Sequence, residues 1–162
     1  MKKNWFIIEK IVGGLIVIWG MIVLYNTTAV VLESINYGHV PPPNLSYMRI
    51  FKLNHLNFLL SLATMFAGTL MIFNDKEGWL LAIICTAMYS LAFFMSARFN
   101  SMDTTQPYFQ FFKSYSLIAL VFFAIVILLL QKPFRQKYHV TTKNWLWAIA
   151  VLIVLIIDKI IF

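Results

Sequence analysis

Five long apolar stretches are the feature that most constrains this chain. They cover approximately residues 11–32, 56–73, 79–97, 114–130 and 145–162. A helix needs roughly 20 mostly apolar residues, with about 17 as the lower limit, to cross a hydrocarbon core of about 30 Å. The chain is therefore expected to be all-α. We predict a polytopic integral membrane bundle that forms one membrane-embedded domain over residues 1–162.

The composition supports a membrane protein over a soluble one. Hydrophobic residues make up 61% of the 162 residues and charged residues 12%, whereas soluble domains carry about 25% charged residues. A water-soluble chain of 162 residues could not bury so much apolar surface in one core. The net charge of +7 does not indicate a nucleic-acid partner, because the basic residues lie between the apolar stretches and do not cluster on one face.

The last apolar stretch decides between five and four spans. It has thirteen apolar residues, Trp145–Ile157, before the charged pair Asp158-Lys159. If the stretch crosses the membrane, this pair must reach the far interface or find a local partner. We favour five transmembrane helices. In the alternative with four, residues 145–162 form a re-entrant or interfacial helix.

Basic residues predict the orientation. With five spans, one side of the membrane carries the N-terminal tail, the 74–78 turn and the 131–144 loop, with Lys2, Lys3, Lys10, Lys76, Lys132, Arg135, Lys137 and Lys143. The other side carries Arg49, Lys52, Arg98, Lys113 and Lys159. Cytoplasmic loops are enriched in Lys and Arg. We therefore expect a cytoplasmic N-terminus in a multi-pass protein of the plasma (cytoplasmic) membrane.

Small residues recur at helical spacing in three of the stretches. Such positions let helices approach closely in lipid, where no hydrophobic effect drives association. The predicted packing positions are Gly13, Gly20, Ala63, Ala67, Gly68, Ala82, Thr86 and Ser90.

The sequence contains few residues that suit catalysis or ion transport. No Asp, Glu, Arg, Lys or His lies in the middle of a span, although proton- and ion-coupled transport usually requires such residues. The sequence has no metalloprotease, nucleophile-elbow or phosphate-loop motif. Cys85 is the single cysteine and is expected to be a buried apolar residue. We expect no cofactor and no metal site. Asp75 and Glu77 are expected to hydrate the 74–78 turn and to cap the following helix.

Two groups of polar residues remain as candidates for binding. Asn26, Thr27 and Thr28, together with His55 and Asn57, could line a polar vestibule near one membrane interface. Helix packing through hydrogen bonds is the more common role of the first group. We favour a hydrated interfacial residue for His55 over a proton shuttle or a metal ligand.

The most basic stretch of the chain is the second candidate. Lys132, Arg135 and Lys137 alternate with Phe134 and Tyr138. Basic juxtamembrane segments of this kind bind anionic lipid headgroups. The topology of the chain would also explain these charges, and it is the simpler interpretation.

One hairpin resembles a known family. The helix end Gly68–Phe73, the short charged turn and Gly78-Trp79-Leu80 loosely resemble small DoxX-type four-helix membrane proteins. The likeness covers about thirty residues. No residue that identifies a function matches, so it implies no site.

The leading functional hypothesis is a small membrane protein of non-enzymatic accessory, assembly or interaction type. It would contact membrane lipids and a membrane-protein partner, or associate with itself. The alternative is a small transporter, channel or membrane-permeabilising effector with a polar path near Asn26–Thr28 and His55–Asn57. A third class, a membrane enzyme acting on lipid or quinone, would use His55, Asp103 or Glu33.

Overall fold

The computed structural model describes residues 3–36, 47–100 and 108–161, and these residues form an all-α bundle. The predicted fold class is thus confirmed at the level of helices. Six helices follow in order: α1 (Lys3–Asn36), α2 (Tyr47–Ile72), α3 (Lys76–Asn100), α4 (Tyr108–Leu129), α5 (Lys132–Tyr138) and α6 (Thr142–Ile161). Asp103 lies outside the described residues.

Three of the helices are long and apolar enough to cross a membrane. They contain the segments Trp5–Glu33, Asn54–Ile72 and Lys76–Ser96. The bent pair α4–α5, with an angle of 55° at its break, adds a fourth candidate. Helix α6 is not among the candidates; it carries Lys143, Asp158 and Lys159 within 20 residues. Three to four helices thus have the length and composition of membrane spans, which indicates a membrane protein. The five spans expected from the sequence are not confirmed.

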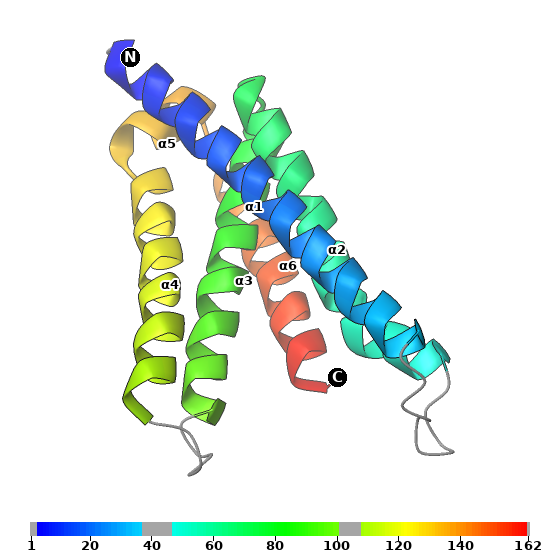
Figure 1. The fold of residues 1–162 in the computed structure, drawn as a ribbon. Coiled ribbons are helices and arrows are strands. Elements are labelled where there is room, and N and C mark those ends of the chain that lie inside the picture. Colours follow the sequence, from blue (N-terminus) through cyan, green and yellow to red (C-terminus); the bar gives the residue numbers. More distant parts are fainter. Residues whose placement is uncertain (1–2, 37–46, 101–107, 162) are drawn as a thin grey trace.

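Figure 1 shows how the helices are arranged. Helices α1 and α2 form an antiparallel pair that is tilted relative to α3, α4 and α6 (Figure 1). The N-terminal part of α1, the turn between α2 and α3, and α5 lie at one end of the bundle, which we call the α5 end. Helix α3 is central, because it packs against α2, α4 and α6. The basic segment that we expected to be a loop contains the short helix α5.

Glycines bring the backbones of α1 and α2 into contact. A Cβ atom added at Gly68 would lie 2.6 Å from the carbonyl oxygen of Gly13 and 2.9 Å from the backbone nitrogen of Val17. A Cβ atom at Gly20 would lie 3.0 Å from the carbonyl oxygen of Ser61. No larger side chain fits at these distances, so the two helices pack through the small-residue faces that the sequence suggests.

The turn between α2 and α3 is built by two residues. Asn74 adopts a left-handed conformation with φ of 64°. The Asp75 N–H donates to Leu70 and the Asn74 N–H to Met71, which is the Schellman pattern that ends a helix. The Asp75 carboxylate then accepts from the Glu77 N–H at 2.7 Å and caps α3. The expected capping role of Asp75 is therefore confirmed.

Helix α3 supplies much of the core. Ala82 and Thr86 are buried, and the Ser90 hydroxyl donates to the carbonyl oxygen of Ala119 on α4 at 3.0 Å. Trp79 is fully buried, and its indole N–H donates to the Leu129 carbonyl at 3.2 Å. Ala82 and Thr86 thus lie in the interior of the bundle, and Ser90 contacts α4.

The outward faces of the helices are apolar. Ile11 and Leu15 on α1, Leu120 on α4, and Trp147 and Val154 on α6 are each more than half exposed. Soluble monomers rarely expose so many large apolar side chains together, whereas lipid accommodates them.

Two glycines, Gly68 on α2 and Gly14 on α1, provide a test of the close contact. Gly68→Ala places a methyl group against the backbone of α1, so we expect it to destabilise the protein by about 1–3 kcal/mol. Gly14→Ala is the matched control, because nothing lies within 4 Å of a Cβ atom at that position. Thermal unfolding in one detergent measures both. Equal losses for the two variants would contradict this account of the α1–α2 contact.

Candidate functional site

A fully buried carboxylate is the most unusual polar group in the described part of the chain. Glu9 on α1 has no exposed surface. The Lys137 ammonium group donates to one of its carboxylate oxygens, and the Tyr138 hydroxyl donates to the other. A buried ionised carboxylate is very costly unless it is paired and hydrogen-bonded. Both oxygens of Glu9 meet this condition through α5.

The polar cluster continues to the turn between α2 and α3. The side-chain oxygen of Asn74 accepts from Lys137 at 2.7 Å. Asn74 therefore has two roles, because its left-handed backbone also ends α2. We call Glu9, Asn74, Lys137 and Tyr138 the Glu9 cluster. It joins α1, the α2–α3 turn and α5 at one point.

The surroundings of Tyr138 hold its side chain in place. Its hydroxyl donates to the Glu9 carboxylate. Its ring stacks on the Trp79 indole with 5.4 Å between the ring centroids. Tyr138 is thus a fixed hydrogen-bond donor. Solvent does not reach the carboxylate of Glu9. The Glu9 cluster is therefore a clamp, in the sense that its hydrogen bonds hold α1, the α2–α3 turn and α5 together.

A second polar contact lies near the opposite end of the bundle. His55 Nε2 on α2 lies 2.9 Å from the Asp158 carboxylate on α6. The other ring nitrogen, Nδ1, contacts the carbonyl oxygen of Lys52. Both ring nitrogens of His55 thus lie against oxygen atoms, one of the backbone and one of a carboxylate. We expected His55 to be hydrated and Asp158 to pair locally or snorkel; the structure brings the two together across 103 positions of sequence.

The other residues of the predicted vestibule differ in burial and in hydrogen bonding. Asn26 and Asn57 are exposed, whereas Thr27 is buried. The Thr28 hydroxyl donates to the Leu24 carbonyl of its own helix at 2.8 Å. Glu33 is exposed at the far part of α1.

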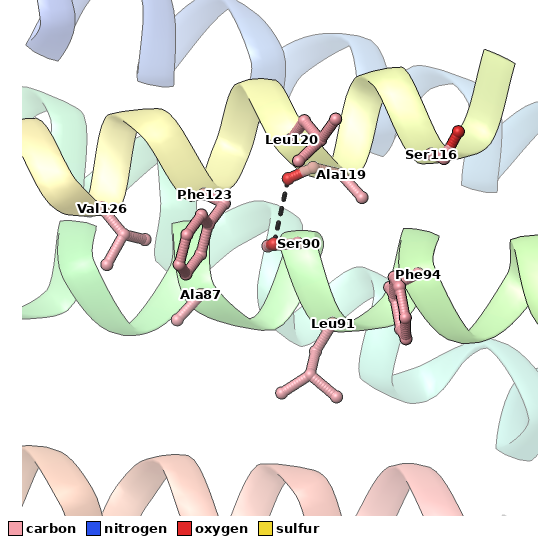
Figure 2. A pocket seen from close by; sticks show the side chains of 9 residues that line it. All are labelled: Ala87, Ser90, Leu91, Phe94, Ser116, Ala119, Leu120, Phe123 and Val126. Carbon is pink, nitrogen blue, oxygen red and sulfur yellow. Dashed lines mark hydrogen bonds between the residues drawn. The ribbon is translucent and has the colours of Figure 1, made fainter. Parts of the chain in front are cut away.

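A groove runs between α3 and α4 (Figure 2). It has a volume of about 490 Å³. Small residues line part of it, and bulkier apolar side chains line the rest. The residues that define this α3–α4 groove are Ala87, Ser90, Phe94, Ala119, Leu120 and Phe123, with Leu91, Ser116 and Val126 beside them. Its surface is almost entirely apolar.

The three cations predicted to contact lipid have different surroundings in the structure. Lys132 and Arg135 lie on the exposed side of α5. Lys137 instead turns inward to Glu9, because Phe134 and Tyr138, on either side of it in the sequence, are both buried. Among the described residues, no group of three His, Cys, Asp or Glu side chains could hold a metal ion.

Sequence reasoning missed Glu9 as a partner of Lys137, although a signal was present. Glu9 precedes Gly13 by four residues and Gly20 by eleven, so it lies on the packing face of α1. A carboxylate on that face requires a basic partner. The sequence offers several basic residues, and only the fold selects Lys137.

Removing one partner of the Glu9–Lys137 pair tests the clamp. Lys137→Met leaves the Glu9 carboxylate buried without its cation, so we expect a loss of about 3–5 kcal/mol in the free energy of unfolding. The double variant Glu9→Leu, Lys137→Met should lose less than the sum of the two single variants, because no charge is left buried. Chemical or thermal unfolding in detergent measures these values.

The matched control is Lys143→Met, since Lys143 is exposed and forms none of the ion pairs of the described residues. Its effect should remain within about 0.5 kcal/mol. Additive effects in the double variant would show that Glu9 and Lys137 do not interact.

No family model, no curated protein and no solved structure matches this chain.

Proposed function

We propose that this protein is a non-enzymatic interaction subunit of the plasma membrane, with five spans and a cytoplasmic N-terminus. Its α3–α4 groove would receive an apolar transmembrane helix of a membrane-protein partner. The observation that carries the proposal is the groove itself: an apolar surface with small residues that remains open on one side of the bundle.

The chemistry of the groove suits a helix. Ala87 and Ala119 leave space for close approach, and Phe94 and Phe123 stand beside them (Figure 2). Helices associate in lipid through van der Waals packing against small residues, not through the hydrophobic effect. A partner helix with its own small residues at four-residue spacing would gain such packing along the groove.

The remaining small positions are engaged inside the chain. Gly13, Gly20 and Gly68 hold α1 against α2. Ala67, Ala82 and Thr86 are buried, and Ala63 packs beside the second core cluster. These positions support the bundle and leave the α3–α4 groove as the surface for a partner.

Helix α6 is the proposed fifth span. Its 20 residues give a length of about 30 Å at 1.5 Å per residue, which equals the hydrocarbon thickness. Its contacts with α2 and α3 supply neighbours, and the pairing of Asp158 with His55 lowers the cost of its charged end. The basic residues of the α5 end favour a cytoplasmic location for that end.

The alternative function, a transporter or channel, has less support. The His55 ring is engaged by Asp158, and the Thr28 hydroxyl is engaged by its own backbone. These contacts reduce the number of polar side chains that could line a transport path through the bundle. Liposome flux that depends on Asn26 and Asn57 would favour this alternative.

A partner should be lost when the groove is filled. In native mass spectrometry of gently solubilised membranes, the unmodified protein is expected to carry a stoichiometric partner, or a second copy of itself. Ala87→Phe places a ring in the groove and should reduce that complex at least about tenfold, which corresponds to 1.4 kcal/mol.

Ala124→Phe is the control, because Ala124 is exposed on α4 and does not line the groove. The complex should persist in this variant. A wild-type protein that is monomeric in native lipid, or a complex that survives Ala87→Phe, would contradict the proposed docking site.

The proposed fifth span can be tested separately. Lys143 and Lys159 are exposed and lie near the two ends of α6. In a Cys85→Ala background, Lys159→Cys should react with a membrane-impermeant maleimide from outside intact cells, and Lys143→Cys should react only after permeabilisation. Labelling of both positions from the same side would show that α6 does not cross.

A further inference from the structure

We infer that a basic pocket between α5 and the start of α6 binds the phosphodiester headgroup of an anionic phospholipid. The pocket is lined by Lys132, Arg135, Gln136, Val140 and Trp145 and has a volume of about 410 Å³. It is distinct from the α3–α4 groove, and the inference does not depend on the proposed partner.

The first argument is uncompensated charge. The two ion pairs of the described residues use His55 and Lys137 as their basic members. Lys132 and Arg135 therefore have no carboxylate within 4 Å in that part of the chain. Their positions are three apart, so they share one face of α5. Two cations that face one pocket repel each other until an anion occupies it.

The second argument is the kind of donor present. The Arg135 guanidinium group matches the geometry of two phosphate oxygens, and Lys132 adds a point charge. The Gln136 amide supplies a further donor. Trp145 contributes an indole, a side chain that is enriched at the level of lipid headgroups. These groups suit an anionic headgroup such as a phosphodiester and disfavour a cationic ligand.

The third argument is position. Helix α5 connects the end of α4 to the start of α6, so the pocket lies where apolar helices end and headgroups begin. Leu130 and Leu146 flank the pocket residues in the chain and are exposed. Apolar side chains at this position can contact the acyl chains of a lipid. A free phosphate ion has no apolar part that could contact them.

The fourth argument is that the pocket is held in place before any lipid binds. Phe134 and Tyr138 anchor the opposite face of α5 in the core, and Lys137 is bound to Glu9. The inward face of α5 thus fixes the outward face, with Lys132 and Arg135 aimed at the pocket. A preformed site loses less conformational freedom on binding.

Native mass spectrometry with two lipids of identical acyl chains tests the inference. The unmodified protein should retain phosphatidylglycerol and release phosphatidylcholine under the same activation. In the double variant Lys132→Gln, Arg135→Gln the preference should fall roughly 30-fold, because each cation near the surface contributes about a factor of five. Arg135→Lys keeps the charge and should lose only part of the preference.

The control variant Lys143→Gln, Lys159→Gln removes the same charge from exposed positions outside the pocket. It should retain the preference for phosphatidylglycerol. An equal loss in this control would overturn the inference, since general surface charge would then explain binding.

A competition experiment separates the lipid from free phosphate. Millimolar inorganic phosphate or glycerol 3-phosphate should fail to displace bound phosphatidylglycerol. Displacement by either ion would overturn the assignment to a lipid and would indicate a site for soluble phosphate. The lipid preference and the partner complex are measured independently, so failure of one leaves the other standing.

Discussion

The buried carboxylate of Glu9 sets the geometry of one end of this bundle. A charge without solvent contact must be neutralised by nearby groups, and Lys137 and Tyr138 perform this role from a helix 128 positions away in the sequence. Asn74 extends the same network to the α2–α3 turn. The N-terminal part of α1, the turn and α5 are therefore connected to each other by one cluster of hydrogen bonds.

The orientation of α5 follows from that interaction. Phe134, Lys137 and Tyr138 are committed to the interior, so Lys132 and Arg135 are left on the other face. A seven-residue helix has little stability of its own, because nucleation of a helix is costly. Burial of Phe134 and Tyr138 and the contact with Glu9 give α5 its place, and the basic pocket is a consequence.

The middle of the bundle depends on a different constraint, the small size of selected residues. Glycines at three positions allow the α1 and α2 backbones to touch. Ser90 satisfies a carbonyl on α4 while it holds α3 close. The same small residues, Ser90 and Ala119, line the α3–α4 groove (Figure 2), and no side chain of the described bundle fills it.

The sequence by itself determined the helical class, the membrane environment and the small-residue faces. These properties depend on apolar length and on residue spacing, which are local. It predicted the capping of α3 by Asp75 for the same reason. The tertiary structure alone decided that Lys137 binds Glu9 and that His55 pairs with Asp158. Partners separated by more than 100 residues are selected by packing, and no local pattern distinguishes Lys137 from Lys132 or Arg135.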